Sequence, residues 1–250
     1  MAESVAGKTA LITGASKRLG RATALALAGE GVNIVVHYRA SAAAAEELAA
    51  ELAARGVQAW PMAADLADPA SHDALIAQAR EVAGSLDILI NNASIFAPDT
   101  IAQVTFDAVL RNAQVNAWAP FALSRAFAGQ VGRGKIVNLL DAKVKGHDPA
   151  HVSYILSKHL LAVLTRMTAL EFAPDITVNA VAPALILPPA GKDYAYLDQL
   201  AARVPLKRHG DPQDIADAIV FLVKSAYITG QVIYVDGGWH LNEGREWTES

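Results

Sequence analysis

Residues Thr9–Gly20 read TALITGASKRLG, an apolar run followed by a turn that begins and ends on glycine. The run predicts a strand over Thr9–Thr13, and the turn predicts entry into a helix opened by Arg21. Gly14 lets the chain turn, Gly20 lets the helix pack close to the strand, and free amides at the helix start face an anion. We expect a pyrophosphate site, with a ligand-free turn of the same shape as the alternative.

Apolar runs of this kind recur along the chain and alternate with Ala- and Leu-rich segments of helical spacing, such as Ser41–Arg55 and Pro69–Ala83. The alternation predicts the α/β fold class, with a parallel sheet covered by helices on both faces. The length fits one domain over residues 1–250. The expected strands are Thr9–Thr13, Asn33–His37, Val57–Met62, Ile88–Asn91, Lys135–Leu140, Thr177–Val181 and Val232–Val235.

Composition narrows the classes of function. A net charge of −4 argues against a nucleic-acid or anionic-membrane partner. The absence of cysteine rules out disulfides, thiolate metal sites and a cysteine nucleophile, and we expect no metal. The start, Met1–Ser4, lacks the pattern of a signal peptide, and no apolar run is long enough to span a membrane. We therefore expect a cytoplasmic protein that acts on a small molecule.

Three polar residues in the second half of the chain predict an active site. Tyr154 and Lys158 are four residues apart, so on a helix they share one face. A phenol beside an ammonium is suited to donating and accepting a proton. Asp141 follows the predicted strand Lys135–Leu140, at the sheet edge where open α/β folds bind ligands. The alternative for Asp141 is a capping residue after the strand.

The end of the second strand bears on which dinucleotide is bound. An acid there would bind the ribose 2′-hydroxyl of NAD, but the first acid is Glu46, inside a predicted helix. His37 and Arg39 offer cationic or donor groups, and Ser41 can cap the next helix. These features favour the 2′-phosphate of NADPH, unless Arg39 is only a solvated loop residue. Asp65 is expected to bind the adenine amine or to cap a turn.

In this order and spacing the residues resemble the short-chain dehydrogenase/reductase family over about residues 8–241. The motifs are Thr13-Gly14…Gly20, Asp65, Asn91-Asn92-Ala93, Asn116, Tyr154-x-x-x-Lys158, Asn179, Pro183 and Val235-Asp236-Gly237-Gly238. The resemblance implies a Rossmann-type, doubly wound single domain, a nicotinamide cofactor and usually a homotetramer. It implies cofactor contacts from Gly14, Ser16, Lys17, Arg18, Leu19, Gly20, His37, Tyr38, Arg39, Ser41, Asp65, Leu66, Asn92, Ala93, Ser94, Tyr154, Lys158, Pro183, Leu185 and Ile186.

Departures from the commonest family pattern resemble the pteridine reductase branch, which includes dihydromonapterin and dihydrofolate reductases. Arg18 replaces the middle glycine of the turn, and its guanidinium is expected to meet a phosphate or an anionic substrate. Ser94 replaces the glycine after Asn-Asn-Ala, and Asp141 replaces the usual serine. His37-Tyr38-Arg39 and the aromatic Phe96 add further matches. The implied pterin slot is Arg18, Ser94, Phe96, Asp141 and Tyr154, with ordinary core as the alternative for Phe96.

The expected reaction is hydride transfer from NADPH to a carbon–nitrogen double bond of a pterin. Asp141 would deliver the proton, with Tyr154 as its hydrogen-bond partner or relay. Lys158 would hold the nicotinamide ribose and, together with the oxidised nicotinamide, lower the pKa of Tyr154. By the same resemblance, Asn116 would maintain a water or backbone link to Lys158. The alternatives are a ketone, sugar or 3-oxoacyl thioester reductase of the same family, and a non-catalytic NADPH-binding sensor or scaffold.

A proline-rich stretch breaks the rhythm of strands and helices at about residues 182–203. We expect it to form a lid over the site, with an ordinary surface connection as the alternative, and its substrate contacts stay unassigned. Ala184 stands where the family usually has glycine, so the backbone is expected to differ there. His151 is expected to be solvent-exposed at a helix start rather than to touch substrate, and no role is assigned to His240.

Overall fold

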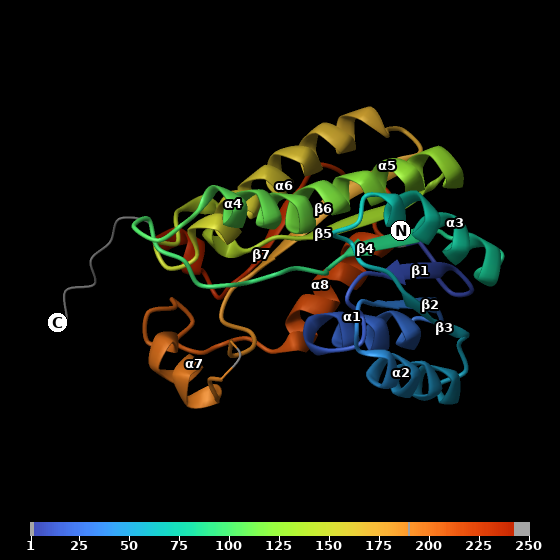
Figure 1. The fold of residues 1–250 in the computed structure, drawn as a ribbon. Coiled ribbons are helices and arrows are strands. Elements are labelled where there is room, and N and C mark those ends of the chain that lie inside the picture. Colours follow the sequence, from blue (N-terminus) through green and yellow to red (C-terminus); the bar gives the residue numbers. More distant parts are fainter. Residues whose placement is uncertain (1–2, 190, 243–250) are drawn as a thin grey trace.

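Seven strands form one parallel sheet in the order β3-β2-β1-β4-β5-β6-β7 in the computed structural model of the chain, which describes residues 3–189 and 191–242 (Figure 1). The sequence prediction of this sheet is confirmed, and each strand end moves by at most two residues. The strands are β1 Thr9–Ile12, β2 Asn33–Tyr38, β3 Ala59–Ala63, β4 Ile88–Asn91, β5 Gly134–Leu139, β6 Ile176–Pro183 and β7 Val232–Val235.

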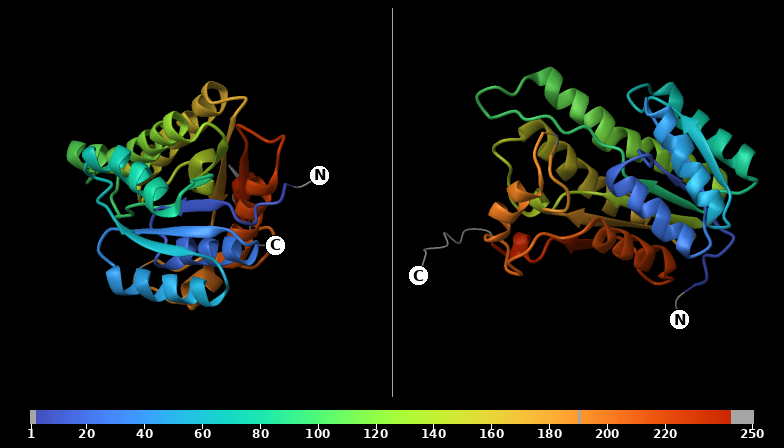
Figure 2. Two further views of the ribbon diagram at one scale, coloured as in Figure 1. Left: turned by 90° about the vertical axis from the view of Figure 1, so that its right-hand side faces the viewer. Right: turned by 90° about the horizontal axis from the view of Figure 1, so that it is seen from below.

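Helices cover both faces of the sheet, with α1, α2 and α8 on one side and α3 to α6 on the other (Figures 1 and 2). They are α1 Arg18–Gly29, α2 Ala42–Ala54, α3 Ala70–Ala83, α4 Phe106–Ala113, α5 Ala119–Val131, α6 Val152–Glu171, α7 Tyr194–Ala201 and α8 Pro212–Lys224. Shorter turns are the π-helix η1 Gln114–Trp118 and the 3₁₀ turns η2 Ala142–Lys145 and η3 Trp239–Asn242. None of the helices described is long and apolar enough to cross a membrane.

The two cores explain why the strands read as continuous apolar runs. Successive side chains of a strand point to opposite faces. In β1, Ala10 and Ile12 pack toward the layer of α1 and α8, while Leu11 packs toward α3 and α5. Because both faces are covered, no strand position on β1 needs a polar residue, and all four are buried.

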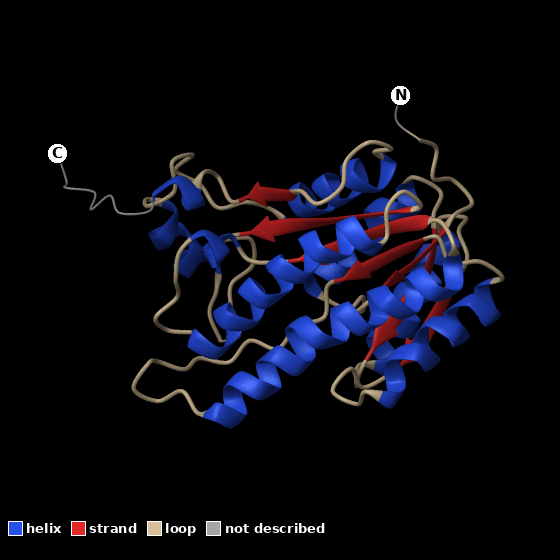
Figure 3. Cartoon of the chain, turned by 90° about the horizontal axis from the view of Figure 1, so that it is seen from above, coloured by secondary structure: helices blue, strands red, loops and turns tan. Residues whose placement is uncertain are grey.

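The parallel strands end at a common edge, toward which the arrows point in Figure 3. The strand order reverses direction between β1 and β4, so the loops after these two strands leave the sheet on opposite faces. Such a reversal opens a crevice outside the carboxyl ends of the strands. The fold therefore places the turn after β1 and the polar segment after β4 beside one another.

The turn after β1 fits the close approach that its glycines predicted. Gly14 has φ +63, a left-handed conformation that glycine adopts without steric cost. A Cβ on Gly20 would collide with the carbonyl oxygen of Gly14 and lie 2.9 Å from the Cα of Ala15. Helix α1 begins at Arg18, three residues before the predicted Arg21. Arg18 keeps a glycine-like φ of +54, a strained conformation for a residue with a side chain.

His37 lies under this turn and ties it to the third strand. The backbone N–H of Gly14 donates to His37 Nδ1 at 3.1 Å, so that nitrogen carries no proton. Nε2 must then donate to the carbonyl oxygen of Ala64, at 3.2 Å. Burial lowers the pKa of His37 to about 4, against weaker opposition from the Ala64 carbonyl and Asp65. The ring is neutral, so of the cationic or donor roles expected for His37 the cationic one is wrong, and both ring nitrogens are bonded within the protein.

The buried, neutral His37 predicts a loss of stability in mild acid. The imidazole has a pKa of 6.5 when unfolded and about 4 when folded, so the unfolded chain binds more protons between these values. Stability from this group is therefore present above pH 6.5 and is lost as the pH falls toward 4. Between pH 7 and pH 5 the wild type should lose about 2 kcal/mol more unfolding free energy than His37→Gln, measured by urea denaturation. Equal losses in the two proteins would show that His37 does not titrate in this way.

Candidate active site

A pocket of about 510 Å³ lies at the carboxyl edge of the sheet, beside the turn after β1. It joins the predicted nucleotide end, at Arg39, to the predicted catalytic end, at Tyr154. Of the residues predicted to contact the cofactor, its lining includes Gly14, Ser16, Lys17, Arg18, Leu19, His37, Tyr38, Arg39, Ser41, Asp65, Leu66, Asn92, Ala93, Ser94 and Tyr154. Phe96 also lines it, together with Ala40, Ile95 and Val115, which the sequence did not single out.

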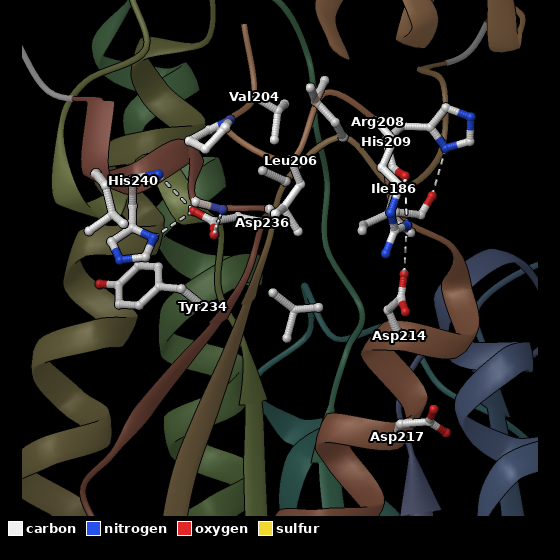
Figure 4. Close-up of a pocket in the computed structure, with 18 residues that line it drawn as sticks. Ile186, Val204, Leu206, Arg208, His209, Asp214, Asp217, Tyr234, Asp236 and His240 are labelled. Carbon is white, nitrogen blue, oxygen red and sulfur yellow. Dashed lines mark hydrogen bonds and ion pairs between the residues drawn. The ribbon is translucent and has the colours of Figure 1, made fainter. Parts of the chain in front are cut away.

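The remaining predicted cofactor residues lie outside this lining. Gly20 and Lys158 are buried behind it, and Pro183 ends β6. Leu185 and Ile186 line a second pocket of about 610 Å³, behind the loop that leaves β6 (Figure 4). Ala184 stands where the family usually has glycine. The residue after it, Leu185, has φ +47 and so takes a left-handed conformation.

The second pocket lies among the β6–α7 loop, the segment before α8 and the end of β7. Figure 4 shows Asp236 and His240 on one side of it and Arg208 and Asp214 on the other. His240 Nδ1 lies 2.7 Å from Asp236 Oδ2, and its ring stacks on Tyr234 with centroids 4.2 Å apart. Asp141, Tyr154 and Lys158 do not line this pocket. Its contacts hold the C-terminal turn η3, and we assign it no part in catalysis.

Tyr154 lines the catalytic end of the first pocket, and Asp141 lies behind it, bonded to the phenol but not among the residues that line the pocket. Tyr154 lies in the first turn of α6, and its hydroxyl donates to Asp141 Oδ2 at 3.2 Å. The other oxygen of Asp141 accepts the backbone N–H of Lys143 at 2.9 Å and so caps η2. Asp141 therefore fills both roles weighed from the sequence, the cap and the active-site acid.

Lys158 lies one turn further along α6, as its spacing predicted. Its ammonium donates to the carbonyl oxygen of Leu139 at 2.7 Å and lies 5.6 Å from the centre of the Tyr154 ring. Burial lowers the pKa of Lys158 to about 8, with Asp141 acting in the opposite direction. The ammonium of Lys158 is therefore fixed at the end of β5. With a pKa of about 8, it begins to lose its charge just above neutral pH.

The acid and the phenol hold their protons more tightly than free side chains do. Burial raises the pKa of Asp141, against opposing effects of the Lys143 amide and the Lys143 and Lys158 ammonium groups. Burial also raises the pKa of Tyr154 well above its ordinary value, and the Asp141 charge adds to this. This direction is opposite to the lowering expected from Lys158, because burial of the phenol, and after it the Asp141 carboxylate 3.2 Å from the hydroxyl, raises the pKa. Tyr154 is thus a protonated hydrogen-bond donor to Asp141.

Asn116 is placed in the π-turn η1, a local widening of the helix that often marks functional sites. Its side-chain oxygen accepts the N–H of Ile95 at 2.8 Å, and its amide donates to the Ile95 carbonyl at 3.0 Å and to Ser157 Oγ at 3.1 Å. Within the described part of the chain, no direct hydrogen bond joins Asn116 to Lys158. Asn116 instead fastens the segment after β4 to helix α6, next to Lys158.

Phe96 lines the pocket and is 48% exposed, so it is not ordinary core. Its ring stacks on His151, with centroids 4.0 Å apart and planes at 17°. It also meets the edge of Tyr154 at 4.7 Å and 85°. His151 Nδ1 lies 2.9 Å from Asp148 Oδ2. The expectation of a solvent-exposed His151 is therefore wrong, and the signal that was missed is its spacing of three residues from both Asp148 and Tyr154.

Arg18 reaches across the pocket instead of lying along it. Its guanidinium donates to the carbonyl oxygen of Pro188 at 2.9 Å, so it joins the turn after β1 to the loop that follows β6. Ala190, in the same loop, is outside the described residues. The predicted lid segment thus has one defined contact over the pocket, through Arg18. The expected contact of Arg18 with a phosphate or anionic substrate stays a prediction.

The nucleotide end of the pocket contains an exposed cation, Arg39, and one acid, Asp65. Arg39 is exposed there, and Ser41 precedes α2 without making a capping bond through its side chain. Asp65 accepts the N–H of Ala67 at 3.0 Å, which is the turn-capping alternative considered for it. The predicted cap by Ser41 is wrong, and its hydroxyl remains available to a ligand in the pocket.

The chain is similar in sequence and in fold to known oxidoreductases. A sequence model of the family described as enoyl-(acyl carrier protein) reductase matches residues 14–240. The chain is similar to the 3-oxoacyl-[acyl-carrier-protein] reductase FabG of Staphylococcus aureus, with 35% identity over 245 residues, 94% of this chain and 98% of the relative.

Two solved structures share the fold across almost the whole chain. FolM alternative dihydrofolate reductase 1 from Brucella canis, complexed with NADP, has a TM-score of 0.92 and 29% identity, and the match covers 100% of both chains. A blue fluorescent protein from a metagenomic library, in complex with NADPH, has a TM-score of 0.88 and 32% identity, covering 95% of this chain and 99% of the other. Both structures were solved with the phosphorylated dinucleotide.

The electrostatics of the pair predict how Tyr154 titrates. Asp141→Asn removes the charge that raises the pKa of Tyr154 but keeps the shape of the side chain, so the phenol should ionise at lower pH. The measurement is tyrosinate absorbance near 295 nm during an alkaline titration, with folding followed by circular dichroism. The protein has six tyrosines, and Tyr154→Phe identifies the signal of this one. A Tyr154 pKa that stays the same or rises in Asp141→Asn would contradict the assigned cause.

Proposed function

Since the chain belongs to the short-chain dehydrogenase/reductase family and is an NADP-dependent oxidoreductase, we propose that it reduces a pterin, such as a dihydropterin, dihydromonapterin or dihydrofolate. The observation that carries the proposal is the hydrogen bond from Tyr154 to the Asp141 carboxyl, at the place where the family usually has a serine. The likeness to the Brucella FolM structure supports the same substrate class.

The residues around the first pocket fit NADPH. The left-handed turn at Gly14 and Arg18 opens a concave surface of backbone amides at the start of α1, which suits a pyrophosphate. Arg39 and Ser41, whose hydroxyl makes no capping bond to α2, would bind the 2′-phosphate. Tyr154 and Lys158 would hold the nicotinamide ribose. When bound, the cofactor supplies a hydride. The prediction of a phosphorylated dinucleotide is confirmed by the comparisons, while these individual contacts stay proposals.

Asp141 and Tyr154 together would move the proton that the substrate needs. An ionised carboxylate only accepts hydrogen bonds, so Asp141 polarises a ketone oxygen poorly. Once protonated, which its raised pKa favours, it can donate to a ring nitrogen of a pterin. Tyr154 donates to Asp141 and, with its own raised pKa, keeps a proton in the pair throughout. The pair therefore matches reduction at carbon–nitrogen better than at carbon–oxygen bonds.

A second candidate is reduction of a 3-oxoacyl thioester. Its support is the 35% identity to FabG, which is as strong a link as the likeness to FolM. The two candidates separate in a parallel assay of NADPH oxidation with dihydrobiopterin, dihydromonapterin or dihydrofolate and with acetoacetyl thioesters. Activity on the thioesters alone would replace the pterin proposal with this one.

The expected homotetramer stays a prediction. Helix α6 presents Leu156, Leu160, Val163, Met167 and Leu170 to solvent, and Leu170 is 83% exposed. These positions are spaced by four and three residues along one face of the helix. A continuous apolar stripe of this kind is usually covered in solution, and a second copy of the chain would cover it.

Asp141→Asn should lower turnover with a dihydropterin by about 10²–10⁴-fold, because a proton donor of matched pKa is lost. NADPH affinity, measured by protein fluorescence, should change by less than about twofold, because the expected cofactor contacts do not include this side chain. Steady-state NADPH oxidation gives the turnover. Unchanged turnover would remove Asp141 from proton delivery, and a large loss of NADPH affinity would mean that the substitution acts through the cofactor.

Arg39→Asp should shift cofactor preference from NADPH toward NADH. Loss of a charge-assisted hydrogen bond to a phosphate is worth roughly 1.5–3 kcal/mol, so the ratio of the two kcat/KM values should fall by about 10- to 100-fold. The matched control is Arg80→Asp, which changes the net charge equally but lies on α3, away from the pocket. An unchanged ratio in Arg39→Asp would leave Arg39 as a solvated loop residue.

A further inference from the structure

We propose that His151, held by Asp148, is a positioning residue that orients Phe96 as the surface on which the substrate's flat ring stacks. The inference rests on the proposed pterin reduction for the identity of that ring. It adds to the site two residues outside the predicted catalytic and pterin-binding sets. Phe96 itself would touch the substrate, whereas His151 and Asp148 would act through it.

The three rings form a fixed corner at the catalytic end of the pocket. His151 and Tyr154 project from the start of α6 three residues apart, so they lie on one face of the helix. His151 covers one face of the Phe96 ring at 4.0 Å, and Tyr154 meets it edge-on at 4.7 Å. Phe96 nevertheless remains 48% exposed and lines the pocket. The uncovered part of the ring is therefore presented to whatever occupies the catalytic end.

Asp148 fixes the tilt of the His151 ring. Its side chain is 4% exposed and accepts hydrogen bonds from Lys143 Nζ at 2.6 Å and from the Ala150 N–H at 3.0 Å. Burial acts to raise the pKa of Asp148, but Lys143, the Ala150 amide and His151 outweigh it and lower the pKa. The carboxylate is therefore ionised and can only accept, so His151 Nδ1 carries the proton of their 2.9 Å hydrogen bond.

The backbone on both sides of Phe96 is already fastened. On one side, Asn116 binds both the N–H and the carbonyl of Ile95. On the other, the Asp99 N–H donates to Ala150, and the Asp99 carboxylate accepts the N–H of Ser153 at the start of α6. Hydrogen bonds therefore hold the main chain at Ile95 and at Asp99, on either side of the segment that carries Phe96. Within this segment the stack with His151 limits the side-chain torsions of Phe96.

The contribution of such a stack should appear in substrate binding and much less in the chemical step. An aromatic pair is worth about 0.5–1.5 kcal/mol beyond area burial. Among the described residues no hydrogen bond or ion pair joins His151 to Asp141, and the bond from Tyr154 to Asp141 does not involve His151. Removal of the imidazole should therefore raise KM for the pterin and leave kcat close to that of the wild type.

The kinetic test compares His151→Ala, which removes the stacking ring, with His151→Phe, which keeps one. His151→Ala should raise KM for a dihydropterin by about 2- to 10-fold with kcat within about twofold of wild type. His151→Phe should restore most of the KM. His147→Ala, a nearby exposed histidine outside the stack, is the matched control and should change neither value. An unchanged KM in His151→Ala, or no rescue by phenylalanine, would overturn the proposal.

A spectroscopic readout separates failure of this inference from failure of the proposed function. In protein labelled with 4-fluorophenylalanine, the ¹⁹F resonance of Phe96, assigned among six phenylalanines by Phe96→Leu, should move in His151→Ala and in Asp148→Asn but not in His147→Ala. This readout needs no substrate, so it holds even if the wild type reduces no pterin. An unmoved Phe96 resonance in both variants would overturn the positioning role, whatever the enzyme reduces.

Discussion

The joint between the turns after β1 and β4 is the constraint on which the rest of the site depends. Thr13 Oγ1 is buried and accepts the backbone N–H groups of both Asn92 and Ala93, at 2.9 and 3.0 Å. Asn92 Nδ2 returns hydrogen bonds to the carbonyl oxygens of Thr13 and Gly14. These bonds lie where the strand order reverses, between β1 and β4. Open sheets of this order have a crevice at that point, and the bonds link its two sides. They extend the β1–β4 ladder beyond the ends of the two strands and so join the turn after β1 to the segment after β4.

The segment after β4 transmits this order to the catalytic residues. It leaves the joint at Ala93, is gripped by Asn116 at Ile95, and is fastened to the start of α6 by Asp99. Helix α6 then carries Tyr154 in its first turn and Lys158 in its second. Each contact pairs a backbone N–H with a side-chain oxygen, of Thr13, Asn116 and Asp99 in turn, so the distance between the turn and the phenol depends on these three polar side chains.

The sequence predicted the elements of the fold well because their signals are local. Apolar runs bounded by turns located every strand, and the four-residue spacing of Tyr154 and Lys158 placed both on one helix. The starting residue of α1 was missed because Arg18 takes a left-handed conformation that is rare for arginine, and no neighbour in the sequence announces it. The role of His37 was missed for a different reason. Its strand position was evident, but its neutral state depends on burial and on Gly14 and Ala64, which only the folded chain brings to its ring.

The same distinction explains the electrostatics at Tyr154, on which the proposed choice between a pterin and a ketone substrate depends. A lysine four residues away on a helix suggests a lowered phenol pKa, but among the protein's own groups burial and the acid that follows β5 outweigh it and raise the pKa. The lowering expected from an oxidised nicotinamide stays a prediction. In ketone reduction a phenol is most useful when it polarises an oxygen and gives up its proton readily. A phenol bound to a carboxylate, both buried and both with raised pKa values, resists that loss. Under the proposed pterin reduction, the pair would present an acid to a basic ring nitrogen, so one side chain, Asp141, raises the pKa of its partner and is the residue on which the proposed class of bond depends.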